Sequence, residues 1–402
     1  MSSKNNSNSL KKFKIKDICD VIKGTTPTMK AIPGKFPLVV TAENRKSNET
    51  YQINSSAVCI PLVSSTGHGH ASINRIHFQE GKFALANIMV AIVPKNERVF
   101  AKYLYYLFDF KKNEYFVSLM KGTANVSLKV KDVENIIISL PDDAIQKRIV
   151  AKIEELFSLI DLAKDTLEKT QVLLKQYRQS ILKHAFEGKL VPQDPNDEPA
   201  SVLLEKIKKE NPDKKFSDIV SEKELPKRWM YIEFKKSIKN IPLTGKKLKQ
   251  KEYLQTGKFP VIDQGQNFIG GFTNKEDFLV ECKLPVIIFG DHTKVIKFVN
   301  QEFVAGADGI KVLQPNSFFV PKLLYYFIHA MPLPNKGYAR HFQYLEKSNI
   351  KLPPLNEQKR IVAKIEESFS LIEKNENIVE SLLSENAQMK DSIFHKYFKN
   401  YL

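Results

Sequence analysis

The chain has 402 residues, and its 62 Lys and Arg against 45 Asp and Glu give a formal net charge of +17. A hydrophobic fraction of 42% excludes a disordered chain, and the length allows about two to four domains. The three widely spaced cysteines exclude a disulfide framework, and no apolar run approaches the roughly 18 residues of a membrane span. We therefore expect a cytoplasmic protein with no membrane segment and a polyanionic partner.

Residues 1–140 predict a first globular block of mixed structure. Strand-like stretches occupy 36–40, 57–63 and 83–93, and a short helix is expected around 103–110. This mixture is typical of an α+β fold.

A long helix is predicted over residues 141–187, with Gly188 just beyond its end. Its apolar residues are spaced alternately by four and three, which is typical of a coiled-coil seam. At about 1.5 Å per residue, the stretch from Ile145 to Phe186 spans roughly 60 Å. The seam residues are Ile149, Ile153, Leu156, Ile160, Leu167, Leu174 and Ile181, with Ala163, Thr170 and Tyr177 at the positions between the last four.

A linker rich in proline and charge follows at residues 188–225, with room for one short helix near 201–210. A second globular block is predicted over residues 226–350. Its expected elements are strands at 285–289, 295–299 and 310–313 and a helix at 321–330.

The last segment, residues 351–402, repeats the long helix. Residues 146–161 read QKRIVAKIEELFSLID and residues 358–373 read QKRIVAKIEESFSLIE, 212 residues later. Gly34-Lys-Phe-Pro37 and Gly257-Lys-Phe-Pro260 extend the similarity into the blocks. The sequence thus predicts an internal two-fold pseudo-repeat, in which two α+β blocks are separated by a long antiparallel two-helix coiled coil. The second seam is Ile361, Ile365, Ile372, Val379, Leu382, Met389 and Ile393, with the polar residues Ser368, Asn375 and Asn386 in the same phase.

The positive charge lies in the two globular blocks. Residues 1–140 carry a net +10 and residues 226–350 a net +9, whereas residues 141–225 carry −2 and residues 351–402 carry none. Two basic blocks on a neutral scaffold indicate two modules that bind nucleic acid, because neutralised phosphates supply much of the affinity.

Polar, glycine-containing segments of each block suit contacts to base edges and phosphates. In the first block the candidate DNA-binding residues are Lys23, Thr25, Thr26, Asn44, Arg45, Ser65, Thr66, His68, His70, Arg75, Lys121, Thr123 and Asn125. In the second block they are Lys246, Lys247, Gln264, Gln266, Asn267, His292, Thr293, Lys294, Lys336, Tyr338, Arg340 and His341.

Catalytic and metal-binding signatures are missing from the sequence. It has no Gly-x-x-x-x-Gly-Lys-Ser/Thr loop, no Asn-Pro-Pro-Tyr or Asp-Pro-Pro-Tyr motif, and no fourth ligand to join His68, His70 and Cys59. Pro141-Asp142 and Glu187-Gly-Lys189 match the letters of a nuclease motif, but the predicted long helix separates them by some 60 Å. We therefore expect no catalytic residues, no metal site and no cofactor in this chain.

Several motifs resemble the specificity subunits of type I restriction-modification enzymes. They are residues 352–365 with the matching 141–153, the tail 180–191, Leu225-Pro226 with Trp229, and the block motifs at 289–293, 306–310 and 337–341. One departure is Asp142-Asp-Ala-Ile145, which stands where the second copy has Pro354-Leu-Asn-Glu357.

The resemblance implies that each block is a target recognition domain for half of a bipartite double-stranded DNA site, and that the paired helices are the spacer. It also implies two modification (methyltransferase) subunits and a restriction subunit as partners, which would use S-adenosylmethionine, Mg²⁺ and ATP. Because the blocks differ in sequence, the two half-sites should differ. Two alternatives remain: a free-standing DNA- or RNA-binding regulator, and a nuclease or methyltransferase that acts alone.

Overall fold

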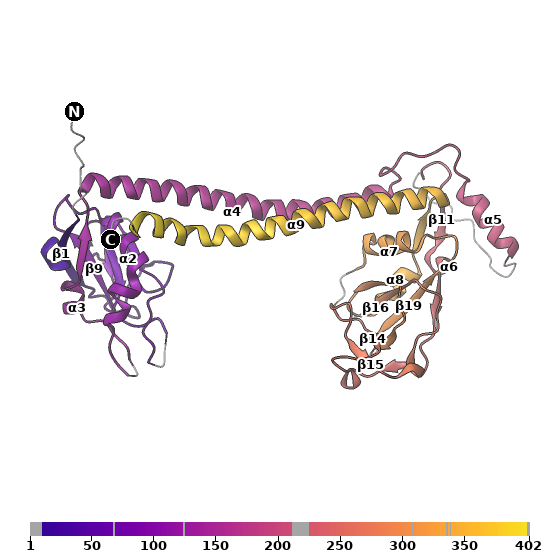
Figure 1. Ribbon diagram of the computed structural model, residues 1–402, viewed down its shortest axis with the longest axis horizontal. Coiled ribbons are helices and arrows are strands. Elements are labelled where there is room, and N and C mark those ends of the chain that lie inside the picture. The colour runs from indigo at the N-terminus through magenta and orange to yellow at the C-terminus, as the bar shows by residue number, and fades with distance from the viewer. Residues whose placement is uncertain are drawn as a thin grey trace, which may run out of the picture. The chain divides into compact units, whose positions relative to one another are not determined.

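The computed structural model describes residues 10–66, 69–123, 125–210, 225–306, 309–334, 337 and 339–399 (Figure 1). These residues form two compact units. Unit 1 comprises the residues up to 168 together with those from 380 onward, and unit 2 comprises residues 169–379. Each unit contains one of the two globular blocks and parts of both long helices.

The globular block of unit 1 contains a two-stranded ladder and two four-stranded sheets. The ladder pairs β1 with β10, and the sheets have the strand orders β2-β9-β6-β7 and β4-β3-β8-β5. Its elements are β1 (Lys11–Lys14), α1 (Ile15–Ile18), β2 (Cys19–Lys23), β3 (Phe36–Val39), β4 (Lys46–Asn48), β5 (Ile53–Asn54), β6 (Ala57–Pro61), β7 (His77–Gln79), β8 (Lys82–Leu85), β9 (Met89–Pro94), α2 (Ala101–Tyr115), the 3-10 turn Val117–Leu119, α3 (Val130–Glu134) and β10 (Ile137–Leu140).

The block of unit 2 repeats this topology. Its ladder pairs β11 with β20, and its sheets have the orders β12-β19-β16-β17 and β13-β18-β14-β15. Its elements are β11 (Met230–Glu233), α6 (Phe234–Ser237), β12 (Ile238–Ile241), β13 (Lys247–Leu248), β14 (Phe259–Ile262), β15 (Gly271–Thr273), β16 (Val286–Gly290), β17 (Ile296–Val299), β18 (Val304–Gly306), β19 (Ile310–Pro315), α7 (Pro321–Ala330), α8 (Phe342–Glu346) and β20 (Asn349–Leu352), with 3-10 turns at Gln250–Glu252 and Glu276–Phe278. The duplication that the helix motif indicates therefore extends through both blocks.

Two long helices, α4 (Asp143–Phe186) and α9 (Leu355–Phe398), run in opposite directions. In unit 1 the first half of α4 lies beside the second half of α9, where the Asn386 side-chain amide donates to the Ile160 carbonyl (3.1 Å). In unit 2 the second half of α4 lies beside the first half of α9, where Arg178 pairs with Glu376 (3.1 Å). The predicted antiparallel coiled coil is confirmed. Helix α5 (Ala200–Glu210) follows in the linker.

The seam is narrower than the sequence predicts. One row of seam positions, every seventh residue from Ile153 and from Ile365, is buried or half-buried along both helices. The other row turns outward away from the helix starts: Leu382 is 42% exposed and Met389 51% exposed, so both assignments to the seam are wrong. A straight helix of 3.6 residues per turn drifts by about 20° per heptad relative to a seven-residue repeat, so a row that is in contact at the helix start rotates outward over several heptads.

Each globular block packs, through one short helix, on the start of one long helix and the end of the other (Figure 1). In unit 1, α2 shares an apolar cluster with the first turns of α4 and the last turns of α9; Tyr103, Ile153 and Phe398 are fully buried in it. In unit 2, α7 shares the equivalent cluster with the start of α9 and the end of α4, which includes Leu324, Ile365 and Ala185.

Candidate nucleic-acid interface

Three of the candidate segments in the second block converge at the end of β16. The backbone N–H of His341 donates to the Asp291 carbonyl (2.9 Å), and the N–H of Phe342 donates to the Asp291 carboxylate (2.8 Å). On the other side, the Thr293 hydroxyl donates to the Gln264 carbonyl (2.8 Å). The structure thus brings the loops around Gln264, Thr293 and His341 together at one site.

This convergence depends on a glycine. Gly309 has a φ of +89°, and a Cβ atom there would lie 2.8 Å from both the Gln264 amide nitrogen and the His292 ring. Any larger residue would push the two candidate side chains apart. This close packing explains why the motif Gly306-Ala-Asp-Gly-Ile310 accompanies the two polar segments, although residues 307 and 308 lie outside the described ones.

A buried lysine, Lys297, fixes the loop that contains Gln266 and Asn267. Lys297 donates to the carbonyls of Asp263 (2.8 Å) and Asn267 (2.6 Å), and its burial lowers the pKa of its ammonium group. An exposed ring, Phe268, follows at the loop tip. The loop borders an open hollow of about 490 Å³, lined by Gln266, Phe268, Thr293, Lys294, Val295, Ile296, Lys297, Phe298, Tyr325 and His329. Sequence reasoning missed Phe268 and Tyr325, because apolar residues carry no sign of their exposure.

The equivalent site in the first block follows β6, as residues 291–294 follow β16. The N–H of Ser64 donates to the Val126 carbonyl (3.0 Å), which joins the segments 64–75 and 121–126. A Cβ atom on Gly69 (φ +79°) would lie 2.4 Å from the Thr123 carbonyl oxygen. Ser65, Thr66, His70, Lys121, Thr123 and Asn125 therefore lie in two adjoining loops and are exposed, whereas His68 lies outside the described residues.

A second site in the first block contains Lys23, Thr25 and Thr26. The Gln52 side chain fixes this turn: it accepts from the backbone N–H and the hydroxyl of Thr25 (3.1 Å each) and donates to the Lys23 carbonyl (2.8 Å). Gln52 was missed by the sequence because it lies 27 residues from its partner.

The Arg45 guanidinium is engaged within the protein. It donates to the Gln79 side chain (3.1 Å) and to the Phe78 carbonyl (3.3 Å), and lies 2.9 Å from the Nδ1 of His77. Burial, reinforced by the charge of Arg45, lowers the pKa of His77 to about 4. Arg75 pairs with Glu43 (2.7 Å) beside this group. Arg45 thus orders the loop that exposes Asn44.

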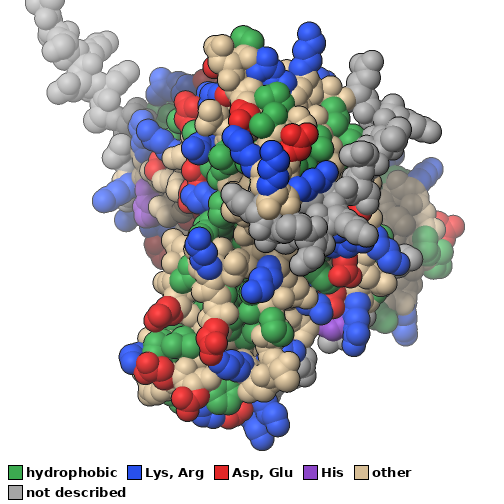
Figure 2. Space-filling view, turned by 90° about the vertical axis from the view of Figure 1, so that its right-hand side faces the viewer, with side chains coloured by type: hydrophobic (Ala, Val, Ile, Leu, Met, Phe, Trp, Pro, Cys, Tyr) green, Lys and Arg blue, Asp and Glu red, His purple; other side chains and the backbone are tan. Residues whose placement is uncertain are grey.

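The structure describes three further candidates of the second block, of which Arg340 adjoins the β16 site. Lys246 pairs with Glu281 (2.5 Å), Lys247 begins β13, and Arg340 is exposed beside the buried His341. Lys336 and Tyr338 lie outside the described residues. On the face drawn in Figure 2, Lys and Arg side chains are spread among other residues rather than gathered in one patch.

A buried glutamine joins each block to its long helix. The Gln146 side chain accepts from the Phe100 N–H (2.9 Å), at the N-cap of α2, and donates to the carbonyls of Arg98 (3.0 Å) and Pro141 (2.8 Å). Gln358 repeats the arrangement with the N–H of Val320 (2.8 Å) and the carbonyls of Phe318 (2.9 Å) and Pro353 (3.0 Å). Each glutamine therefore fixes the position of one globular block on the long helix that contains the glutamine.

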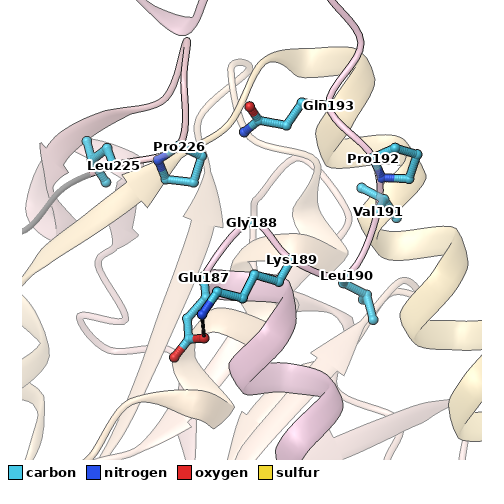
Figure 3. A pocket seen from close by; sticks show the side chains of 9 residues that line it. All are labelled: Glu187, Gly188, Lys189, Leu190, Val191, Pro192, Gln193, Leu225 and Pro226. Carbon is cyan, nitrogen blue, oxygen red and sulfur yellow. Dashed lines mark hydrogen bonds and ion pairs between the residues drawn. The ribbon is translucent and has the colours of Figure 1, made fainter.

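Glu187-Gly-Lys189, the second part of the nuclease-like motif, lies at the end of α4. Glu187 and Lys189 pair with each other (2.9 Å) on the rim of an open hollow of about 680 Å³ (Figure 3). Gly188 has a φ of +70°, and a Cβ atom there would lie 2.4 Å from the Pro226 ring, so it is needed to end the helix. These residues therefore form a helix terminus.

Among the described residues, no cluster of three His, Cys, Asp or Glu side chains could hold a metal ion, and no helix is long and apolar enough to cross a membrane.

Comparison with known proteins gives one family and several relatives. The family model for the type I restriction modification DNA specificity domain matches residues 8–171 and 226–383. The EcoDI type I restriction enzyme specificity subunit of Escherichia coli is 25% identical over 405 aligned positions, covering 92% of this chain and 83% of that protein. The EcoAI specificity subunit of the same species is 28% identical over 269 positions, 57% of this chain and less than half (45%) of that protein.

Solved structures show the same fold. The HsdS subunit of Thermoanaerobacter tengcongensis aligns over 98% of this chain and 97% of its own, with a TM-score of 0.60 at 16% identity. A structure from work on complex assembly and conformational transition of the type I R-M system aligns over 98% of each chain, with a TM-score of 0.63 at 17% identity.

Proposed function

The chain belongs to the family of type I restriction modification DNA specificity domains, and from this premise we propose that it is the specificity subunit that selects the DNA site of a type I restriction-modification enzyme. Each recognition block reads one half of an asymmetric bipartite duplex site, and the α4–α9 pair is the spacer. The observation that carries this proposal is that two blocks of one topology present different side chains from equivalent loops. The same frame then reads two different sequences.

Methylation and cleavage are assigned to partner subunits, which use S-adenosylmethionine, Mg²⁺ and ATP. The polar loops of each block are ordered by their own hydrogen bonds, as at Thr25 and Thr293, and leave neighbouring amide, hydroxyl and ammonium groups exposed. Such ordered donors suit base edges and phosphates. The chain therefore contributes recognition, in a cytoplasmic complex, and no catalytic group.

Two modification subunits dock on exposed apolar side chains of the long helices. Leu159 of α4 and its repeat Leu371 of α9 are both exposed, and so are Tyr177 (58%) and its repeat Met389. Apolar side chains in a row on an exposed helix face are typical of a surface that another helix covers. Because each unit presents the same pair of positions, two copies of one partner fit. The restriction subunit joins this assembly.

The proposal is tested by mapping methylated bases in cells that express this chain with its modification subunit. We expect one bipartite motif with two different halves. Replacing both Thr293 and Lys294 by Ala should change only one half of the motif. The matched control, Lys175→Ala on the exposed surface of α4, should leave both halves unchanged. A methylated motif that consists of one continuous sequence, with no unread spacer, would contradict the arrangement of two recognition blocks.

The alternatives give different results with the purified chain. A nuclease or methyltransferase acting alone would cut or methylate DNA when Mg²⁺ or S-adenosylmethionine is added, and we expect neither. A free-standing RNA-binding regulator would bind RNA at least as tightly as duplex DNA of the mapped sequence, whereas we expect the duplex to bind more tightly.

A further inference from the structure

The first turns of α4 and α9 have the same chemistry but different surroundings. Residues 146–155 and 358–367 are identical in sequence, and both carry the same local ion pair, Lys152 with Glu155 (2.8 Å) and Lys364 with Glu367 (2.9 Å). Any difference in how these two surfaces are covered therefore comes from what packs on them.

In unit 2 the linker covers this surface. The Arg360 guanidinium donates to both carboxylate oxygens of the buried Asp197 (2.6 and 3.3 Å). The hydrogen bonds and the charge of Arg360 hold the pKa of Asp197 below its usual range. Arg228 also donates to the Asp197 carbonyl (2.6 Å). Asp197 is thus fixed on the helix from two sides.

The segment after Asp197 adds an apolar contact. Ala200 and Leu204 of α5 are buried in the cluster that also holds Ile361 and, from the end of α4, Ala185. The covering segment therefore presents an aspartate, an alanine three residues later and a leucine four residues beyond that.

In unit 1 none of the residues that the structure describes covers the equivalent surface in this way. Arg148, the repeat of Arg360, is exposed, and no carboxylate of the described residues pairs with it. Beside it lies an open, largely apolar hollow of about 480 Å³, lined by Arg148, Ile149, Ala151, Lys152, Glu155 and Tyr397. Tyr397 is the repeat of Ala185, so the hollow has the same place in the duplicated frame as the surface that the linker covers.

We propose that this hollow is a docking site for a partner protein that presents an aspartate followed by a short apolar helix, with the pattern Asp-x-x-Ala-x-x-x-Leu. The aspartate pairs with Arg148 as Asp197 pairs with Arg360, and the alanine and leucine cover Ile149 and Tyr397. The inference rests on the internal repeat and is independent of which DNA the protein reads.

A labelled synthetic peptide of residues 190–210 is the probe, because it carries this pattern. Titrated with the full-length chain, it should bind at one saturable site. Arg148→Glu should weaken binding at least tenfold, whereas Lys175→Glu, the same charge change on an exposed part of α4, should leave binding unchanged.

A reversed pair completes the test. A peptide with Asp197→Arg should fail to bind the unaltered chain and should regain binding to the Arg148→Asp chain. Because Arg148 is exposed, circular dichroism should show the same helix content in every variant. Failure of the unaltered peptide to bind, or equal binding by the Arg148→Glu chain, would overturn the proposal.

Discussion

At the scale of single residues, the two buried glutamines have the clearest consequence. A side-chain amide that satisfies three backbone groups in a buried site leaves all three without partners when it is removed, and each such group costs about 1–3 kcal/mol. Gln146 and Gln358 make equivalent sets of bonds 212 residues apart. A substitution of either glutamine should therefore affect mainly the unit that contains it.

We expect Gln146→Leu and Gln358→Leu each to lower the free energy of unfolding by about 2–4 kcal/mol, since partial relaxation and the gain from burying leucine offset part of the loss. Denaturant unfolding measures the change. Gln176→Leu, on an exposed part of α4, is the matched control and should change stability by less than about 0.5 kcal/mol. Equal stability of all three variants would show that the glutamines do not hold the blocks on the helices.

At the scale of elements, periodic and local patterns were the predictable part of the fold. Helix α7 lies where its apolar residues and Pro321 predict it, and both long helices follow their heptads. The ladders β1–β10 and β11–β20 could not be predicted, because strand pairing over more than 100 residues leaves no local pattern. The candidate loops at Gln264, Thr293 and His341 do meet, but Gln52 and Phe268 have no sequence signal.

Of the seam positions that the structure describes, Asn386 is the one polar residue that is buried. Asn375 is exposed and donates to the Leu371 carbonyl of its own helix (2.7 Å), whereas Asn386 is buried and donates across to Ile160. Asn386→Leu should raise the free energy of unfolding by about 1–2 kcal/mol through apolar burial, and should allow wrong helix partners, because a polar seam residue selects register.

Sedimentation and thermal melting measure both effects of Asn386→Leu. Asn375→Leu is the control and should change neither. A strictly monomeric Asn386→Leu chain would show that the asparagine does not select the partner.

The spacer prediction also belongs to the helices. Because α4 and α9 lie side by side, residues must be added to both, after Lys169 and after Ser381. Four residues in each add about 6 Å and 40° of rotation, close to the roughly 35° of one base pair. The methylated motif should keep both halves and gain one or two unread base pairs. Seven residues add about 10 Å but only about −20°, where the DNA turns by about 100°, so activity should be lost. An unchanged motif in an active four-residue variant would exclude the helices as the spacer.

At the scale of the whole molecule, the duplication means that two copies of one half should be able to replace the two different halves. A fragment of residues 1–210 contains one block, one complete long helix and the segment with Asp197. Its helix can bury its seam only against a second copy, and Asp197 of each copy can then pair with Arg148 of the other.

Sedimentation should show a dimer of the 1–210 fragment, and the dimer with the modification subunit should methylate a palindrome of the first half-site. Arg148→Glu should weaken the dimer at least tenfold, and the exchanged pair Arg148→Asp with Asp197→Arg should restore it. A stable fragment that stays monomeric would count against equivalent halves.

The last turn of α9 returns to the unit in which the chain begins. The Phe398 ring lies 5.5 Å from that of Tyr103 and 5.7 Å from that of Phe110, in the same unit as β1. The start and the end of the described chain therefore pack within the same unit. A gene that begins within the linker and joins the present end to the present start should therefore encode a chain that still forms both blocks and both long helices.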